Sequence, residues 1–392
     1  MAMAWLSKLV VVAAIVLAGT GSTDHSPDRV HPAASVRASN AVVRDRGLLL
    51  HDKSVAHHPN FRASKATLSA SIWPRLIDGF TLPAGQPDFV RAELGRVAEN
   101  PRNVEQLLQR GGPYLHFILS EVQERGLPSE LALLPVIESA FDPFARSPQL
   151  ATGLWQFLPH TAVEFDLQLD SWYDERRDLI AGTNAALDFL TQLHRRFDGD
   201  WLLALAAYNA GPARVHRAMR HNRDAGKPIG FWDLDLPEET RDYLPKLLAM
   251  RAIVKAPADY GVRLPTIRDE AFLKVVEAHG PLDLGVAARL AGVTLEEMHR
   301  LNAGYSRRTV RQDGPISLVV PRSTAADFTA KLASLTESER EPWVRHRIRF
   351  GDTLSAIARY YDVPLGRLRE FNRLADARIV AGDVLIVPVV RS

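Results

Sequence analysis

The spacing of apolar residues between positions 71 and 125 predicts three short helices. Apolar side chains recur there at intervals of three and four residues, the period of one helix face. The pattern breaks at Asn100-Pro101 and again at Gly111-Gly112-Pro113, as proline and glycine commonly interrupt helices. No residue type in this stretch points to chemistry. We therefore expect residues 71–125 to be a helical preface that packs on the domain that follows.

Residues 126–262 are patterned as a second, mainly α-helical domain. A helix is expected to begin near Pro128, which suits a first helical turn, and to stop at Phe141, because the next residue precedes a proline. Residues 152–159, TGLWQFLP, have the apolar and aromatic character of an extended segment. Further helices are expected over Asp178–Phe197, over Trp201–Ala207, from about Ala213, and over Glu238–Val254.

The last third of the chain contains an internal repeat. A shift of 70 positions aligns the apolar residues of residues 268–321 with those of residues 343–390. Both units close with an apolar strand that ends in proline, SLVVP and VLIVP. Each unit is therefore predicted to fold as strand, helix, helix, strand. The polar residues 322–341 between them are expected to be a linker.

The N-terminal region predicts export. Residues 5–18 are mostly apolar, contain Lys8 near their start and are followed by small residues, which is typical of a secretory signal over residues 1–21. The apolar run is shorter than the roughly 20 residues of a membrane span. The alternative is an uncleaved anchor, with a weak membrane association through residues 5–18. Residues 22–70 are rich in Ser, His, Pro and Arg and are expected to be a disordered linker.

Composition narrows the chemistry that the chain can perform. The 392 residues include no cysteine, which excludes disulfides, thiolate metal sites and cysteine nucleophiles. The formal net charge is only +2, so no overall field favours nucleic acid as a partner. Histidines at positions 51, 57 and 58 have no acidic neighbour at ligand spacing and are interpreted as solvated. We expect neither a metal nor a cofactor.

One carboxylate lies within an apolar helix pattern. In LLPVIESAF, Glu138 shares a helix face with Leu131 and Leu134, so its side chain is expected to point into the domain or a cleft. Desolvation there would raise its pKa and keep it protonated near neutral pH, as a general acid requires. The alternative is a surface glutamate paired with an arginine. Gln156 in TGLWQFLP, and Tyr208 and Asn209 in AAYNAG, add the amide and aromatic groups that suit sugars.

Four ordered segments carry a specific resemblance. Glu138-Ser139, Gly153-Leu154-Trp155-Gln156, Ala207-Tyr208-Asn209-Ala210-Gly211 and Tyr243 in ETRDYLPKLLA resemble the lytic transglycosylase domain related to soluble lytic transglycosylase and goose-type lysozyme. The second repeat unit resembles a LysM peptidoglycan-binding module, through Gly351, Asp352, Thr353, Leu354 and Asn372. Over about residues 71–390 the order resembles the membrane-bound lytic murein transglycosylase D family. This implies a mainly α, lysozyme-like α+β catalytic domain (126–262) followed by small βααβ LysM modules.

The resemblance also implies roles for these residues. Glu138 would cleave the β-1,4 bond between N-acetylmuramic acid and N-acetylglucosamine, with a 1,6-anhydro end as product. Gln156, Tyr208 and Asn209 would line the sugar groove, and Tyr243 would orient the acid. Ser139 would bond the acid or a sugar acetamide, or else bond back to its own helix. The LysM residues named above would hold peptidoglycan glycan strands.

Two alternative functions remain open, and the sequence departs from the family pattern at two places. Asp142, Glu164 and Asp166 are not compelling as a second carboxylate, which favours a single-acid mechanism. A muramidase that uses water, or a non-catalytic wall-binding scaffold, would fit the same residues. Thr20 stands where a lipidated cysteine is often found in the family, so a protein of the Gram-negative periplasm or envelope that is not a lipoprotein is expected. Residues 272–321 lack the Gly-Asp-Thr turn and are expected to be chiefly structural.

Overall fold

The computed structural model describes residues 71–84, 87–279, 281–307, 309–310, 315–340, 343–361 and 363–388. The predicted signal peptide and the predicted disordered linker lie outside these residues. Within them, no helix combines the length and the apolar character needed to cross a membrane.

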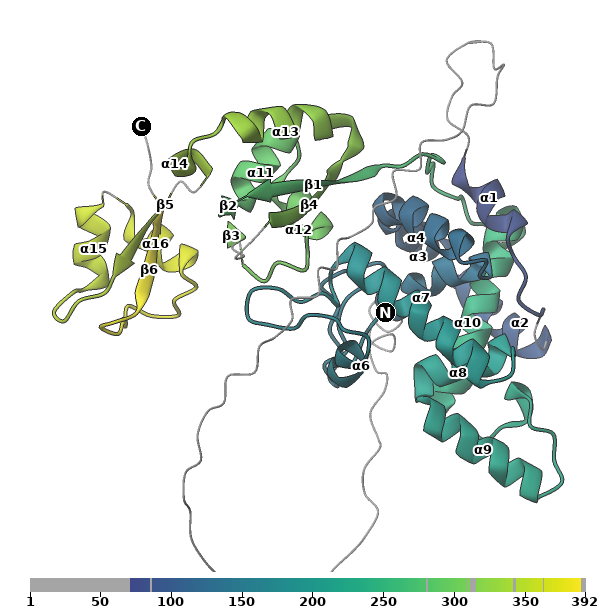
Figure 1. The fold of residues 1–392 in the computed structure, drawn as a ribbon. Helices are drawn as coiled ribbons and strands as arrows, with labels where there is room; N and C mark the ends of the chain where they lie inside the picture. The colour runs from purple at the N-terminus through teal and green to yellow at the C-terminus, as the bar shows by residue number, and fades with distance from the viewer. Residues whose placement is uncertain are drawn as a thin grey trace, which may run out of the picture. The chain divides into compact units, whose positions relative to one another are not determined.

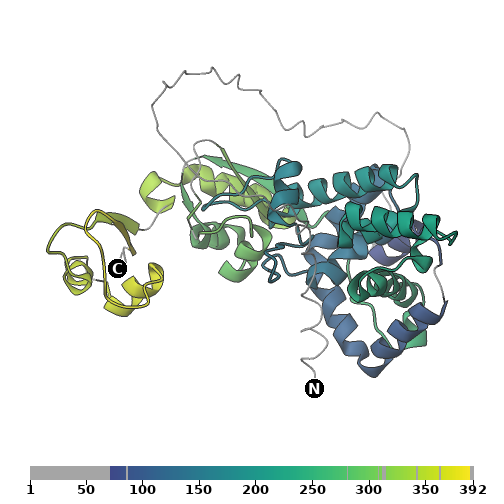
Figure 2. The ribbon, with the colours of Figure 1, turned by 90° about the horizontal axis from the view of Figure 1, so that it is seen from below.

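The preface consists of four helices, which are α1 (Ile72–Asp78), α2 (Pro87–Glu99), α3 (Pro101–Arg110) and α4 (Gly112–Glu124) (Figure 1). The breaks between the last three fall at Asn100 and Gly111, as the sequence predicts. The buried side chains of the preface belong to the same core as those of the domain that follows. Figure 2 shows the preface helices, in purple and blue, against the teal and green helices of that domain. The preface therefore forms one folded unit with that domain.

The central domain is built from helices with little strand structure. Its elements are a 3-10 turn η1 (Ser129–Leu133), α5 (Leu134–Ser139), α6 (Pro159–Glu164), α7 (Leu179–Arg196), α8 (Trp201–Ala210), α9 (Pro212–Asp224), η2 (Phe231–Asp233), α10 (Glu238–Lys255) and η3 (Pro257–Tyr260). Asp178 and Asp200 cap α7 and α8 by accepting bonds from backbone N–H groups of the first turn. The mainly α fold that the sequence predicts is confirmed.

Two local predictions for this domain are wrong. The helix expected from Pro128 to Phe141 is instead a 3-10 turn followed by the short α5. The reason is Pro135, whose ring crowds the carbonyl four residues earlier and prevents a continuous α-helix. Residues 152–159 are not a strand but a tight turn, with isolated bridges from Thr152 to Arg146 and to Phe157.

The first repeat unit contains more than the sequence predicts. Its elements are β1 (Leu273–His279), β2 (Leu282–Asp283), α11 (Leu284–Ala291), α12 (Leu295–Leu301), β3 (Thr309–Val310) and β4 (Pro315–Pro321), and β1 pairs antiparallel with β4. A turn η4 (Arg322–Thr324) leads into α13 (Ala325–Ser334), and α14 (Glu337–Arg340) follows. Phe328 and Leu332 of α13 are buried in the core of this unit. The expectation of a linker over residues 322–341 is therefore wrong for α13.

The second repeat unit has the predicted βααβ order, with β5 (Trp343–Arg347), α15 (Leu354–Tyr360), α16 (Leu365–Phe371) and β6 (Val384–Pro388). Strand β5 pairs antiparallel with β6. The unit has a core of its own, which includes Leu354, Ile357, Leu368 and Leu385. These observations describe a small module with an independent hydrophobic centre.

Candidate active site

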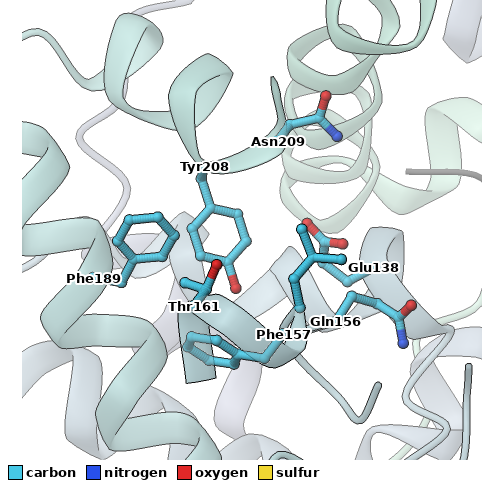
Figure 3. Close-up of a pocket in the computed structure, with 8 residues that line it drawn as sticks. Glu138, Gln156, Phe157, Thr161, Phe189, Tyr208 and Asn209 are labelled. Carbon is cyan, nitrogen blue, oxygen red and sulfur yellow. The ribbon is translucent and has the colours of Figure 1, made fainter. Parts of the chain in front are cut away.

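Glu138 lies at the end of α5 and faces a small cavity. Directly after Ser139 the backbone turns into the left-handed region at Ala140 and Phe141, with φ of 55° and 54°, so the helix stops there. Glu138 as a whole residue is only 7% exposed. It lines a cavity of about 40 Å³ together with residues from four other segments (Figure 3), which are Gln156, Phe157, Leu158, Thr161, Phe189, Tyr208 and Asn209.

The surroundings of Glu138 raise its pKa, so that the carboxyl is still largely protonated close to neutral pH. The pKa of Glu138 is raised to about 7; burial is the largest cause, and the nearby negative charge of Glu239 acts in the same direction. The hydroxyl of Tyr243 donates a hydrogen bond to Glu138 Oε1 at 2.5 Å, which lowers the pKa because it favours the ionised form. An acid with this pKa can give up a proton and take one back at neutral pH.

Tyr243 reaches the carboxyl from α10, more than a hundred residues along the chain. Its side chain is 3% exposed. Burial raises the pKa of Tyr243 well above its ordinary value, so the hydroxyl keeps its proton and remains a donor. The contact between Tyr243 and Glu138 that the family resemblance implies is present.

Two other predicted site residues, Tyr208 and Gln156, direct their polar groups at the backbone. The Tyr208 hydroxyl donates to the carbonyl of Trp155 at 2.8 Å. Gln156 Nε2 donates to the carbonyls of Ala145 and Gly153 at 3.2 and 3.0 Å. These bonds hold the turn that carries Gln156 against the floor of the cavity. Tyr208 and Gln156 thus shape the site as well as line it.

Ser139 does not contact the glutamate through any of its hydrogen bonds. Its hydroxyl donates to the carbonyl of Leu154 at 2.9 Å and to that of Pro135, in its own helix, at 3.2 Å. The bond to Pro135 is the one expected for a hydroxyl that bonds back to its own helix, whereas a contact between Ser139 and a sugar acetamide stays a prediction. Ser139 fastens α5 to the turn after it.

Four residues that line the cavity escape the sequence analysis, namely Phe157, Leu158, Thr161 and Phe189. Phe189 of α7 packs against the ring of Tyr208, with centroids 5.3 Å apart. Thr161 lies in the first turn of α6. Pro159 indicates where α6 begins but not that Thr161 faces the cavity, and nothing in the α7 pattern separates Phe189 from the core residues around it.

The three weaker carboxylates lie elsewhere. Asp142 accepts a bond from the backbone N–H of Phe144 and lies 3.7 Å from Arg300, which fits the turn role expected for it. Glu164 and Asp166 are exposed. Among the described residues that line the cavity, Glu138 is the only carboxylate. In the part of the chain that the structure describes, no three metal-ligating side chains gather.

The predicted LysM residues build the turn between β5 and α15. Gly351 adopts a φ of 90°, and Asp352 accepts bonds from the Arg349 backbone N–H at 2.7 Å and from the His346 ring at 3.0 Å. Thr353 caps α15, and the side chain of Leu354 is buried. A contact between these four residues and glycan stays a prediction.

Asn372 ties the second repeat unit together. Its Nδ2 donates to the carbonyls of Leu368 and Ile386, and its Oδ1 accepts from the Ile386 backbone N–H at 2.8 Å. Asn302 makes the same set of bonds at the equivalent place in the first unit. The two asparagines are therefore shared structural features of the repeat, each joining a helix to the last strand.

Three family models match the chain. Residues 116–229 match the Transglycosylase SLT domain, residues 272–337 match the Lytic transglycosylase MltD, LysM-like domain, and residues 346–388 match the LysM domain. The second match includes α13, in agreement with its place in the core of the first unit. The fold and the site thus define a transglycosylase-type domain followed by LysM-type modules.

The relatives make the assignment specific. Membrane-bound lytic murein transglycosylase D of Escherichia coli (strain K12) is 32% identical over 391 residues, which is 97% of this chain and 84% of that protein. The chain belongs to the membrane-bound lytic murein transglycosylase D family. A putative tributyltin chloride resistance protein of Alteromonas sp. (strain M-1) is 44% identical over 148 residues, 38% of this chain and 71% of that protein. A solved structure of an inactive lytic transglycosylase Slt mutant from Pseudomonas aeruginosa is 29% identical, covers 39% of this chain and 25% of that one, and has a TM-score of 0.29.

Proposed function

We propose that this protein is a lytic transglycosylase that cleaves the β-1,4 bond between N-acetylmuramic acid and N-acetylglucosamine in peptidoglycan. The observation that carries the proposal is the buried Glu138 with its pKa near 7, held by Tyr243 in a cavity with aromatic and amide walls. Family membership supports the same reaction class and the same polymer.

The first half of the proposed reaction uses Glu138 as an acid. Its proton passes to the glycosidic oxygen, the bond from that oxygen to C1 of the muramic acid breaks, and the sugar acetamide stabilises the positive charge left at C1. Raising the pKa by burial prepares the carboxyl for this step, because an acid is most effective when its pKa lies near the working pH.

The second half uses the same group as a base. Glu138, now ionised, takes the proton of the C6 hydroxyl while that oxygen bonds to C1, which gives the 1,6-anhydro ring and restores the acid. Most glycosidases need a second carboxylate to supply a nucleophile or activate water. Here the nucleophile is part of the substrate, and proximity gives it the advantage of an intramolecular reaction. The single carboxylate in the cavity fits this scheme.

We propose that the second repeat unit tethers the enzyme to the cell wall. Binding of a module to the same polymer raises the local substrate concentration without changing the chemistry. The LysM match over residues 346–388 supports this role. We further propose that the chain acts in the cell envelope after export by residues 1–21, on the basis of the apolar segment and the small residues after it.

The test is product analysis of digested peptidoglycan by mass spectrometry. The wild type should release anhydro ends, whereas reducing ends would indicate a muramidase and no cleavage at all would indicate a scaffold. Glu138→Gln keeps the shape of the side chain and removes the proton. The loss in rate should reach about 10⁴, the upper range for general acid–base catalysis, since one residue serves both halves.

The matched control is Glu164→Gln, which changes an exposed carboxyl of the same domain. It should keep wild-type activity, and both variants should fold and bind sacculi. Retention of even a tenth of the anhydro product by Glu138→Gln would mean that Glu138 is not the acid. Unfolding of this variant would mean that the glutamate is a structural residue.

A further inference from the structure

The side-chain NH₂ group of Asn209 faces the cavity without a hydrogen-bond acceptor among the described residues. Asn209, the residue after Tyr208 at the end of α8, is 3% exposed and lines the cavity. Among the described residues, no acceptor bonds its Nδ2. Buried amide N–H groups are almost always hydrogen-bonded, so an unpaired one inside a site indicates a donor that meets its acceptor only when a ligand arrives.

Thr240 fixes the orientation of this amide. The Thr240 hydroxyl, 2% exposed, donates to Asn209 Oδ1 at 2.8 Å. The bond occupies the carbonyl side of the amide and leaves the NH₂ side to the cavity. In Figure 3 the Asn209 amide and the Glu138 carboxyl face each other across the cavity.

The same helix positions both groups. Thr240 and Tyr243 stand three residues apart on α10, so they share one helix face. Tyr243 bonds the acid and Thr240 bonds the amide. An oxygen between them would have the Glu138 carboxylate on one side as an acceptor and Asn209 Nδ2 on the other as a donor. A hydroxyl group is the chemical class that satisfies both, because it donates one hydrogen and accepts another.

We propose that Thr240 is a positioning residue that aims Asn209 Nδ2 at the hydroxyl oxygen deprotonated by Glu138. This inference rests on the proposed function. In the ring-closing step the C6 hydroxyl proton moves to Glu138 and the oxygen bonds to C1, while Asn209 keeps its own protons and only holds the oxygen in place. Water can use the same C1 centre, so holding the C6 oxygen favours the anhydro product over the reducing one.

The test measures the ratio of anhydro to reducing ends together with the cleavage rate, using the full chain on peptidoglycan. Thr240→Val keeps the shape and removes the donor hydroxyl. Anhydro formation should fall about five- to tenfold, as expected for one neutral hydrogen bond, and the reducing fraction should rise. Thr240→Ser retains the hydroxyl and should restore both values. Asn209→Ala should give the same shift as Thr240→Val.

The double variant separates a positioning role from a merely structural one. If Thr240 acts through Asn209, Thr240→Val should add nothing in the Asn209→Ala background. Thr191→Val is the matched control, because the Thr191 hydroxyl bonds only the Leu187 carbonyl of its own helix in the described contacts. This control should leave the product ratio unchanged.

Three results would overturn the inference. One is a wild-type rate and product ratio in Thr240→Val, another is a loss of rate with no change in the ratio, and the third is additive losses in the double variant. Reducing ends from the wild type itself would overturn the proposed function as well. Anhydro ends from wild type and Thr240→Val alike would overturn this inference alone.

Discussion

At the scale of single residues, two neighbours shift the pKa of Glu138 in opposite directions. The Tyr243 hydrogen bond lowers that pKa, and the negative charge of Glu239 raises it. Both partners lie on α10, and Glu239 is half-buried. The pH at which the acid loses its proton therefore depends on a balance that substitutions can shift in either direction.

This balance predicts opposite shifts in the pH profile of kcat/KM. Activity requires protonated Glu138, so it should fall as pH rises through about 7. Tyr243→Phe removes a bond to the ionised form, which raises the pKa and should move the falling limb to higher pH. Glu239→Gln removes a nearby negative charge, which lowers the pKa and should move the limb to lower pH.

Glu164→Gln, an exposed change in the same domain, serves as the reference and should leave the limb in place. Shifts of the two α10 variants in the same direction would contradict this account of the Glu138 environment.

From the sequence, it is easier to predict which residues form the site than to predict which hydrogen bonds they make. The helix pattern around Glu138 predicts its burial, because periodicity encodes which face turns inward. The bonds of Ser139, Gln156 and Tyr208 go to backbone carbonyls of the turn around residues 145–156. Such partners leave no pattern in the side chains, since every residue carries a carbonyl. The role of Thr240 escapes prediction for the same reason: it depends on how α8 and α10 pack.

At the scale of elements, the turn at residues 152–159 shows why an apolar run is not always a strand. Gly153 adopts a φ of 88°, and a Cβ there would lie 1.8 Å from the carbonyl oxygen of Arg176. The chain thus turns at Gly153, where the absence of a side chain lets the segment before α7 pack directly against the backbone of the turn. Short apolar runs predict burial reliably but do not by themselves distinguish a strand from a buried turn.

Gly153→Ala should therefore destabilise the catalytic domain strongly. The added methyl must displace the Arg176 backbone and also adopt a strained φ, and together these effects should lower the free energy of unfolding by roughly 2–4 kcal/mol. Activity should fall as well, since the same turn carries Gln156. The measurement is chemical denaturation with peptidoglycan cleavage in parallel.

Gly226→Ala is the matched control for this substitution. Gly226 also has a positive φ, 64°, but no atom lies within 4 Å of the position that a Cβ would take. It should lose only about 1 kcal/mol, from the left-handed backbone. Equal losses in the two variants would show that close packing at Gly153 contributes nothing.

At the scale of the whole molecule, the hydrophobic cores show the domain boundaries better than the composition of the sequence does. The preface and the catalytic domain share one core, although the sequence pattern predicts two separate regions. The connection includes Glu130, fully buried, which accepts bonds from the backbone N–H groups of Thr81 and Leu82. The repeat units have separate cores. The sequence prediction also misplaces the end of the first unit, because the large apolar residues of α13 are only Phe328 and Leu332, within a stretch that is otherwise small or polar.

These cores predict which truncations leave a working enzyme. Deletion of residues 343–392 removes the second repeat unit with its entire core. Cleavage of soluble glycan fragments should persist, because the catalytic core and α13 remain. Binding to insoluble sacculi should weaken, because the proposed tether is lost. Sedimentation with sacculi and product release from soluble fragments measure the two effects separately.

A longer deletion tests the boundary that α13 sets. Removing residues 322–392 also strips the buried Phe328 and Leu332 from the first repeat unit and exposes the apolar surface beneath them. Loss of a buried phenylalanine alone typically costs about 3–5 kcal/mol, so this unit should unfold or aggregate while the shorter deletion stays soluble. Equal sacculus binding by the full chain and the shorter deletion would refute the tether. Equal solubility of the two deletions would show that α13 is a linker after all.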